Sequence, residues 1–182
     1  MKIIDTAIAD VKIIEPSVFG DQRGFFMETW NANTFADLGL DITFVQDNHS
    51  RSQQGILRGL HYQMQQTQGK LVRVSSGSVY DVAVDIRRSS PTFGQYVGVE
   101  LSADNQRMLW VPPYFAHGFY VISDSADFQY KCTDFYDPES EQCIVWNDPE
   151  LNIQWPLVDN TLPQLSDKDR NGKCFSEAVL FD

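Results

Sequence analysis

Short hydrophobic runs separated by turn-forming residues extend along most of the sequence, and they restrict the fold more than any other feature. Runs rich in Val, Ile, Phe, Tyr and Trp alternate with Gly, Pro, Asn, Asp and Ser at roughly the 8–12-residue spacing of β-sandwiches and barrels. In KLVRVSSGSVYDVAVDIR (70–87), two such runs flank the turn residues SSGS, which predicts a β-hairpin. Residues 96–102 with 107–113, and 117–123 with 127–136, predict two more hairpins. The expected fold class is therefore all-β.

One short helix and a polar C-terminal segment complete the predicted organisation. NANTFADLG (31–39) has a helical pattern that Asn or Thr can cap and Gly39 can end. From Trp155 onward the chain is polar and interrupted by prolines, so we expect a tail (about 157–182) that packs over the barrel as a solvated surface or a lid. The 182 residues are 42% hydrophobic and contain no internal repeat, which predicts a single domain spanning 1–182.

The charge and the hydrophobic pattern exclude several classes of protein. The formal net charge is −11 at pH 7, and binding to phosphate backbones needs clustered Lys and Arg, so a general affinity for nucleic acid or anionic membranes is not expected. A single phosphorylated ligand would need a local basic cluster. No hydrophobic run has the length of a membrane span, and MKIIDTAIADVKII lacks the basic start and cleavage site of a secretory signal. We expect a cytoplasmic protein, and three cysteines without a C-x-x-C pair predict free thiols.

The segment GILRGLHYQ (55–63) contains the first candidate for chemistry, His61. A histidine can accept a proton near neutral pH if a carboxylate fixes its tautomer and stabilises the imidazolium. Arg58 and Lys70 are expected to lie close enough to favour the neutral imidazole. Without such neighbours, a histidine that only hydrogen-bonds inside a barrel would be the more common case. Spacing leaves the supporting carboxylate open among Asp47, Asp81, Asp85, Asp167 and Asp169.

Metal binding is the less favoured interpretation of the histidines. Metal-binding cupins often hold their ion with an H-x-H pair, a Glu and a later His, because imidazole and carboxylate ligands must converge on one ion. The three histidines here are His49, His61 and His117, and no two of them form an H-x-H pair. Such a site would be incomplete, although a site of two histidines and a carboxylate remains open. We predict that the protein binds no metal.

Several other polar residues allow both a structural and a functional interpretation. Arg23 in GDQRGFFMETW is typical of a turn, but Arg also suits bidentate phosphate recognition. FVQDNHS (44–50) is either a loop or a row of side chains that hydrogen-bond a polar ligand. His117 is either a hydrogen-bonded strand residue or a ligand contact. Tyr130 is either a half-buried aromatic residue, which composition alone favours, or a proton donor.

Seven segments, in order across about residues 15–170, together resemble the dTDP-4-dehydrorhamnose 3,5-epimerases. They are FGDQRGFFMETW, FVQDNHSRS, GILRGLHYQ, QGKLVRV, VYDVAVDIRRSSPTFG, VPPYFAHGFYV and WNDPELNIQWP. The resemblance implies a cupin-type jelly-roll barrel, a homodimer, and an isomerase of dTDP-rhamnose biosynthesis, which supplies cell-surface polysaccharides. It also implies conversion of dTDP-4-dehydro-6-deoxy-D-glucose to dTDP-4-dehydro-L-rhamnose without a metal or an organic cofactor.

The same resemblance implies roles for individual residues. His61 is the expected base, and Asp169, with Asp167 as the alternative, is its supporting carboxylate. Tyr130 is the expected proton donor, and Lys70 is expected to stabilise an enolate. The expected substrate contacts, of which the first two serve the site of the neighbouring subunit, are Arg23, Glu28, Gln46, Asp47, Asn48, Arg58, His117, Glu141 and Lys168.

Other activities remain open at this point. The nearest is a related enzyme that epimerises C5 alone, or a ketoisomerase that moves the ketone of a dTDP-4-keto sugar. A different class is a barrel that binds a sugar nucleotide without catalysis. A third is a metal-dependent cupin oxygenase.

Overall fold

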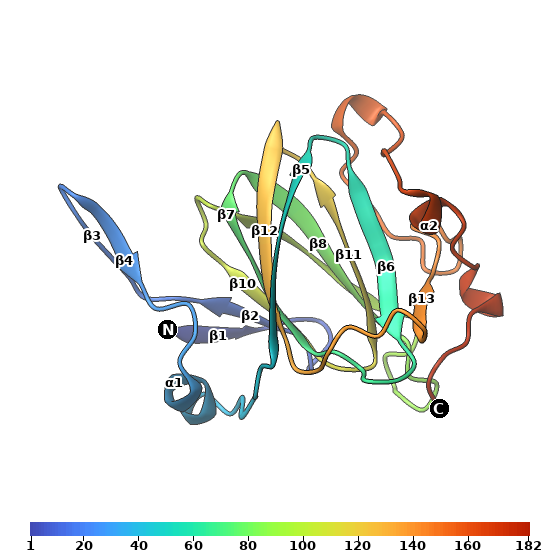
Figure 1. Ribbon diagram of the computed structural model, residues 1–182, viewed down its shortest axis with the longest axis horizontal. Coiled ribbons are helices and arrows are strands. Elements are labelled where there is room, and N and C mark those ends of the chain that lie inside the picture. Colours follow the sequence, from blue (N-terminus) through green and yellow to red (C-terminus); the bar gives the residue numbers. More distant parts are fainter.

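Two antiparallel β-sheets face each other and form the body of the molecule (Figure 1). The computed structural model describes residues 1–182. The first sheet has the order β1 (Lys2–Asp5), β2 (Lys12–Glu15), β10 (Met108–Val111), β7 (Lys70–Ser76), β12 (Ser125–Cys132) and β5 (Gln46–Gln53). The second has the order β13 (Glu141–Cys143), β6 (Leu57–Gln63), β11 (Phe115–Val121), β8 (Ser78–Asp85) and β9 (Tyr96–Ser102). The all-β prediction is confirmed, and the two sheets have a jelly-roll arrangement without closing into a barrel.

The three hairpins predicted from the sequence are wrong, although their strands exist. β7 and β8 are joined by a turn at Gly77, yet β7 pairs with β10 and β12 while β8 pairs with β9 and β11. Gly77 has φ 74°, and a Cβ there would lie 2.0 Å from the carbonyl oxygen of Ser125. The strands of the other two predicted hairpins, β9 with β10 and β11 with β12, are likewise divided between the sheets. Turn residues show where the chain reverses, but in a jelly roll many reversals cross from one sheet to the other.

The N-terminal region carries a small hairpin outside the two main sheets. β3 (Val18–Asp21) pairs only with β4 (Gly24–Met27), and this hairpin projects away from the body (Figure 1). The predicted helix is confirmed as α1 (Ala32–Asp37), and the Asn31 side chain caps it by accepting hydrogen bonds from the backbone N–H groups of Asn33 and Thr34. Neither α1 nor the four-residue α2 (Asp167–Arg170) has the length and hydrophobicity of a membrane span.

Hydrophobic residues are buried on both faces of the second sheet. One cluster contains residues of both sheets, among them Val72 and Phe128 from the first and Phe119 from the second. Another cluster joins the second sheet to buried residues near the C-terminus, including Phe175 and Leu180. The C-terminal segment contains η1 (Val158–Asn160), α2 and η2 (Phe175–Glu177), and it runs along the outer side of β6 and β13 (Figure 1). This position brings α2 next to β6, the strand that carries His61.

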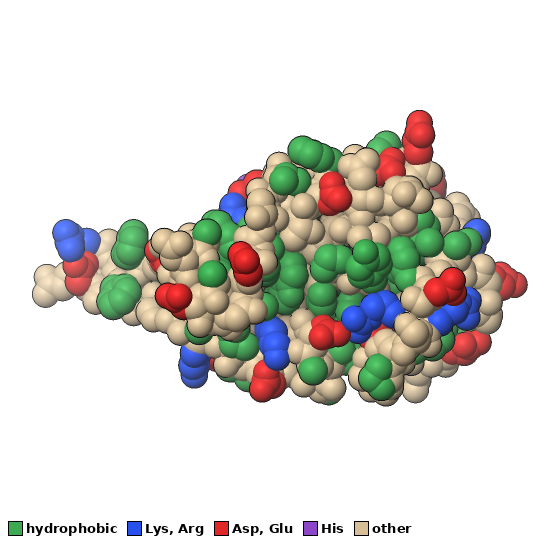
Figure 2. All heavy atoms as spheres, turned by 90° about the horizontal axis from the view of Figure 1, so that it is seen from below, with side chains coloured by type: hydrophobic (Ala, Val, Ile, Leu, Met, Phe, Trp, Pro, Cys, Tyr) green, Lys and Arg blue, Asp and Glu red, His purple; other side chains and the backbone are tan.

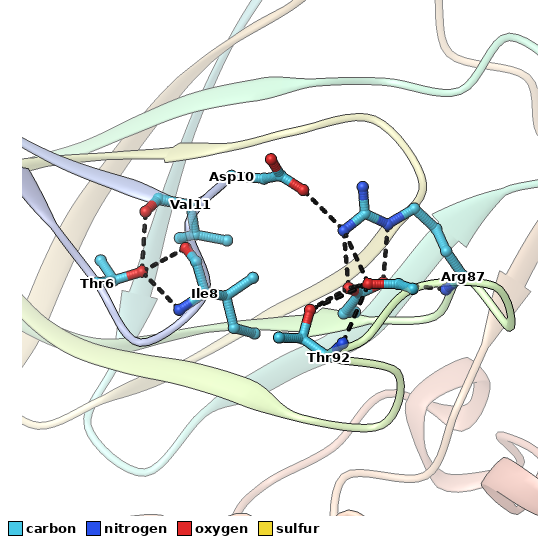
Figure 3. A network of polar contacts seen from close by, with 8 residues as sticks. Thr6, Ile8, Asp10, Val11, Arg87 and Thr92 are labelled. Atoms are coloured by element: carbon cyan, nitrogen blue, oxygen red, sulfur yellow. Dashed lines mark hydrogen bonds and ion pairs between the residues drawn. The ribbon is translucent and has the colours of Figure 1, made fainter.

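A polar network connects the N-terminal turn to the loop that follows β8 (Figure 3). Asp85 is fully buried and accepts hydrogen bonds from Arg87 Nη2 at 2.7 Å and from the hydroxyls of Ser90 and Thr92, both at 2.6 Å. Arg87 Nη2 also donates to Asp10 Oδ2 at 2.8 Å, in the turn between β1 and β2. Burial alone would raise the pKa of Asp85, but these hydrogen bonds outweigh it and lower the pKa to about 2. Asp85 has structural partners, so it is not the carboxylate that supports His61.

Candidate active site

A cavity of about 330 Å³ lies between the two sheets, and polar side chains from both of them line it. A smaller pocket of about 80 Å³ shares His61, Lys70, Tyr130 and Glu141 with this cavity. The lining of the main cavity combines three predicted cations and two predicted imidazoles with hydroxyl, amide and aromatic groups. Its residues are Gln46, Asn48, Ser50, Arg58, His61, Gln68, Lys70, His117, Phe119, Phe128, Tyr130, Tyr136, Glu141 and Lys168.

A β-bulge on β6 directs both Arg58 and His61 into the cavity. These residues are three positions apart, and a regular strand would place them on opposite faces. Arg58 pairs with Phe119 of β11 and His61 with His117, so β6 has one residue more than β11 in this interval. Gly59 in the bulge has φ 124°, and a Cβ there would meet the Cα of Gly118 at 2.5 Å. The glycine of RGLH is therefore required by the close approach of the two strands.

His61 contacts a buried carboxylate that the C-terminal segment supplies. His61 Nε2 lies 2.6 Å from Asp169 Oδ1, and Asp169 is 3% exposed. Asp169 also accepts hydrogen bonds from the Ser166 hydroxyl, at 2.6 Å, and from the backbone N–H of Gly59, at 3.1 Å. Asp167, the alternative carboxylate, is exposed and pairs with Arg170 at 3.0 Å. The geometry therefore favours Asp169 over Asp167.

Burial and charge together keep the imidazole neutral and the carboxylate ionised. Burial lowers the pKa of His61; the hydrogen bond to Asp169 opposes this shift, and the charges of Lys168 and Lys70 add to it. For Asp169, burial would raise the pKa, but the hydrogen bonds from His61 and Ser166 outweigh it and lower the pKa to about 2. With Nε2 held against Asp169, Nδ1 is the nitrogen left to accept a proton.

Lys70 and Tyr130 line the cavity from the first sheet, opposite the wall that carries His61. They lie on the neighbouring strands β7 and β12. Burial lowers the pKa of Lys70, and the nearby Cys132 and Glu141 oppose that shift. Burial raises the pKa of Tyr130 to about 12, so its phenol carries a proton at neutral pH. The arrangement thus places a lysine and a protonated phenol opposite a neutral imidazole.

The polar row FVQDNHS is a strand, and its alternation separates its members. Gln46, Asn48 and Ser50 of β5 line the cavity, whereas Asp47 lies on the other face and pairs with Lys131 at 2.6 Å. The expectation that the Asp47 side chain contacts substrate therefore has no support from its position. Ser50 was missed, although the two-residue period through Gln46 and Asn48 points to it. Its hydroxyl is buried and has no hydrogen-bond partner in the protein.

The remaining predicted contacts divide into those that reach the cavity and those that do not. Glu141 accepts hydrogen bonds from Lys168 Nζ at 2.8 Å and from the Tyr136 hydroxyl at 2.9 Å, and all three line the cavity. Arg58 Nε donates to Ser52 Oγ at 3.1 Å. His117 Nε2 lies 3.0 Å from both carboxylate oxygens of the fully buried Asp81. This pairing commits Asp81 to His117 rather than to His61.

Arg23 and Glu28 lie outside this cavity. Arg23 is in the turn of the β3–β4 hairpin, where its exposed side chain pairs with Asp21. Glu28 follows β4 and accepts hydrogen bonds from Asn31 and Thr34. Because the hairpin projects away from the body, these two residues do not reach the cavity of their own chain (Figure 1).

The three histidines do not converge on one ion. His49 lies 3.6 Å from Asp127, His61 contacts Asp169, and His117 contacts Asp81. The residues that do bring metal-ligating atoms together are His61, Cys143 and Asp169. Of these, Cys143 was not a candidate in the sequence, because its pairing with β6 depends on the sheet topology.

Comparisons with known proteins agree in one family. The sequence profile of that family, dTDP-4-dehydrorhamnose 3,5-epimerase, matches residues 5–177. The dTDP-4-dehydrorhamnose 3,5-epimerase of Pseudomonas aeruginosa is 60% identical over 182 residues, which cover 100% of this chain and 99% of that protein. The crystal structure of a dTDP-6-deoxy-D-glucose-3,5-epimerase from Legionella pneumophila in complex with dTDP-4-keto-L-rhamnose is 58% identical, with TM-score 0.94 over 98% of this chain and 94% of that one. A dTDP-4-dehydrorhamnose 3,5-epimerase from Bacillus anthracis with TDP and PPi bound is 46% identical, with TM-score 0.91 over 95% of this chain and 98% of that one.

Proposed function

Because this chain belongs to the dTDP-4-dehydrorhamnose 3,5-epimerase family, we propose that it converts dTDP-4-dehydro-6-deoxy-D-glucose to dTDP-4-dehydro-L-rhamnose. The observation that carries the proposal is the cavity with His61 and Asp169 on one wall and with Lys70 and Tyr130 on the opposite wall. A catalytic base and a catalytic acid on opposite sides of one space can invert a carbon centre that is held between them.

The first chemical step is removal of a proton from a carbon next to the C4 ketone. His61 takes this proton at Nδ1, while Asp169 holds Nε2 and stabilises the imidazolium that forms. The electron pair of the broken C–H bond moves to the ketone oxygen and makes an enolate. A fixed positive charge close to that oxygen lowers the energy of the enolate, and Lys70 supplies it. The lowered pKa of His61 supports this role, because the imidazole is neutral before the reaction.

Inversion requires that the new proton arrive on the face opposite to the one that lost it. Tyr130 is placed to give this proton, since its phenol is protonated and lies on the wall facing His61. The same sequence of steps at C3 and at C5, each next to the ketone, produces the doubly inverted sugar. Solvent then restores the proton of Tyr130 and removes the proton from His61.

The cations of the cavity explain how an acidic protein can hold a nucleotide diphosphate. Arg58, Lys70 and Lys168 gather at one space in a chain with a net charge of −11. Lys and Arg side chains bind phosphate oxygens through charge-assisted hydrogen bonds. Gln46 and Asn48 add amide groups along β5, and the exposed aromatic side chain of Tyr136 offers a surface for stacking on the thymine base.

The proposal includes a homodimer in which the β3–β4 hairpin reaches the neighbouring subunit. Val18, Phe19, Phe25 and Phe26 are exposed on this hairpin, with Phe26 71% exposed. Figure 2 shows hydrophobic side chains on the projecting arm, beyond the body of the molecule. Burial of these side chains against a second copy would stabilise the dimer, and it would carry Arg23 and Glu28 towards the partner's cavity.

Mixing two inactive variants tests the shared site. Arg23→Ala and His61→Asn each impair every site of their own homodimers, but a mixed dimer contains one site with both residues intact. Recovery of turnover after the two variants are unfolded and refolded together supports the hairpin exchange. If the mixture stays as inactive as its parents while native mass spectrometry shows mixed dimers, Arg23 serves its own chain and this part of the proposal is wrong.

A cytoplasmic location is also part of the proposal. All three cysteines are free in the structure, which suits a reducing compartment. Fractionation of cells with an antibody against the chain tests the location, and recovery in the periplasmic or secreted fraction contradicts it.

Proton exchange with solvent tests the reaction itself. In deuterated water, with a reductase that traps the product, deuterium should appear at both C3 and C5. Labelling at C5 alone would instead indicate a single epimerisation, a moved ketone would indicate an isomerase, and no labelling would indicate a binding protein. Tyr130→Phe sharpens the result, because His61 can still exchange protons while inversion is lost.

A further inference from the structure

Three different kinds of metal-ligating atom meet beside the proposed base. A nitrogen of His61, Sγ of Cys143 and a carboxylate oxygen of Asp169 all lie within 4.8 Å of one another. His61 and Cys143 are directly opposite on the paired strands β6 and β13, so their side chains share one face of the sheet. Asp169 reaches this face from α2. Cys143 has no part in the epimerisation proposed above, so its position needs a separate explanation.

We propose that His61, Cys143 and Asp169 form a binding site for a thiophilic divalent cation such as Zn²⁺, and that a cation bound there inhibits the enzyme. Imidazole, thiolate and carboxylate are the three protein ligands of zinc, and sites with three protein ligands leave a fourth position for water. Metal–ligand bonds of roughly 2.0–2.3 Å place the ligand atoms of a tetrahedral site about 3–4 Å apart. His61 Nε2 and Asp169 Oδ1 lie 2.6 Å apart, so binding a cation requires these two side chains to separate slightly.

Two hydrogen bonds already orient the carboxylate of this site. The Ser166 hydroxyl donates to Asp169 Oδ2 at 2.6 Å, and the backbone N–H of Gly59 donates to Oδ1 at 3.1 Å. Partners of this kind fix the direction of a ligand and strengthen metal binding. A cation would bind Cys143 as a thiolate, because a coordinating thiol loses its proton. Binding therefore releases one proton from Cys143 to solvent for each cation.

Two lysines near the site limit the cations that it can accept. Lys168 and Lys70 line the same cavity as His61, and their positive charges repel a divalent ion. Glu141 offsets part of this repulsion through its ion pair with Lys168 at 2.8 Å. The thiolate then decides the selectivity, because Zn²⁺ and Cd²⁺ bind sulfur whereas Mg²⁺ and Ca²⁺ prefer oxygen.

Inhibition follows from the proposed role of His61 as the base, so this part depends on the proposed function. The cation takes the Nε2 lone pair, and the proton that Nε2 donated to Asp169 moves to Nδ1. The imidazole is then already protonated at the nitrogen that would accept the proton of the sugar. Asp169 becomes a metal ligand and no longer supports the imidazolium. A chelator that removes the cation should restore turnover.

Cobalt is the probe for the site, because Co²⁺ bound to a thiolate gives a charge-transfer absorption in the near ultraviolet. Titration of the full-length protein with Co²⁺ should give this band at one equivalent, and Zn²⁺ should abolish it. Cys143→Ser should lose the band but keep its turnover in the absence of metal, because the residue has no catalytic role. Cys174→Ser is the matched control, since Cys174 is exposed and should leave the band unchanged.

Inhibition by Zn²⁺ is measured on the same three proteins. The Zn²⁺ concentration that halves turnover should rise at least about tenfold in Cys143→Ser. Losing even a group that only hydrogen-bonds a metal ligand costs roughly 10–100-fold in metal affinity. Asp169→Asn should weaken Co²⁺ binding by a similar factor, measured by the absorption band and not by turnover. This variant gives a second test if Cys143→Ser is unstable. Equal inhibition of the wild type and Cys143→Ser would overturn the proposal, as would a band that disappears with Cys174 instead. A one-equivalent band without any loss of turnover would overturn the inhibitory role. Turnover of the wild type without metal tests the proposed function separately. If it is absent, the proposed function fails, whatever the Co²⁺ titration shows.

Discussion

His61 and His117 lie opposite each other on paired strands, and each contacts a buried aspartate, but the two aspartates have different origins. Asp81 belongs to β8, the strand next to β11 in the same sheet, and both of its oxygens lie 3.0 Å from His117 Nε2. Asp169 reaches His61 from α2, which lies 108 residues later in the chain. One pair is complete within the sheet, and the other is completed only when the C-terminal segment packs.

The two imidazoles also differ in how they meet the cavity. The side chain of His61 is 22% exposed and that of His117 is 8% exposed, although both line the cavity. His117 is further held by stacking on Phe128, with ring centroids 6.1 Å apart. A histidine next to an aspartate is therefore a common structural unit in this protein. Each has a ring nitrogen outside its aspartate contact, but the greater exposure of His61 leaves more room for a reacting carbon and suits it better to act as a base.

The largest expected effect comes from removing each imidazole in turn. His61→Asn should lower kcat by about 10³-fold, because general base catalysis contributes roughly 10²–10⁴-fold. His117→Asn keeps a hydrogen-bonding group in the cavity. It should raise KM more than it lowers kcat, so that kcat/KM falls by about tenfold. Steady-state kinetics on both variants checks the difference. Equal losses of kcat would mean that both imidazoles take part in proton transfer.

The two aspartates should separate activity from stability. Asp169→Asn should lower kcat by about 10²-fold, because the amide no longer stabilises the imidazolium. Asp81→Asn should instead lower the free energy of unfolding by roughly 1–3 kcal/mol, because it weakens a fully buried hydrogen bond. Urea denaturation followed by fluorescence, together with kcat, measures both quantities. The comparison fails if Asp81→Asn lowers kcat more than Asp169→Asn does while its free energy of unfolding equals that of the wild type.

The pH dependence of kcat/KM should reveal the environment of His61. The neutral imidazole is the active form, and burial lowers its pKa, so protonation occurs at a lower pH than usual. Activity should thus persist as the pH falls through about 6.5, the ordinary value for histidine, and be lost only below it. Asp169→Asn removes the contact that opposes this shift, so the acid limb of its residual activity should move to still lower pH. An acid limb above 6.5 in the wild type would contradict the assignment.

The smallest effect is expected from the residue that orients Asp169. Ser166 caps α2 and bonds Asp169 with both its hydroxyl donor and its acceptor lone pair. Ser166→Ala should cost about 1 kcal/mol of local stability and lower kcat severalfold, with KM nearly unchanged. Ser176→Ala, at an exposed position in the same segment, is the matched control and should match the wild type. If the two variants behave alike, the cap does not position the carboxylate.

The sequence predicted the strands well and their partners poorly. Alternating hydrophobic residues located β7, β8, β9, β10, β11 and β12, because burial on a sheet face imposes a two-residue period. The pairing of these strands depends on contacts between distant segments, and turn residues such as Gly77 carry no information about which sheet the chain enters next. The hairpins were wrong for that reason.

Site contacts between residues close in the sequence could be predicted, whereas contacts between distant segments could not. The two-residue period of β5 contains the information that separates Gln46 and Asn48 from Asp47 and points to Ser50, but the prediction grouped Asp47 with the other two and missed Ser50. The shared direction of Arg58 and His61 needed a bulge, which no simple alternation reveals. Asp169 was named from the family resemblance, and its contact with His61 joins segments whose separation in the chain carries no local signal.

The late position of Asp169 has a consequence for synthesis of the protein. While the polypeptide is still being translated, the strands that form the walls of the cavity are made well before Lys168 and Asp169, which α2 supplies. A chain interrupted before residue 168 would lack both Lys168 of the cavity and Asp169, the carboxylate partner of His61. The His61–Asp169 pair can therefore form only after the strands of both main sheets have been translated.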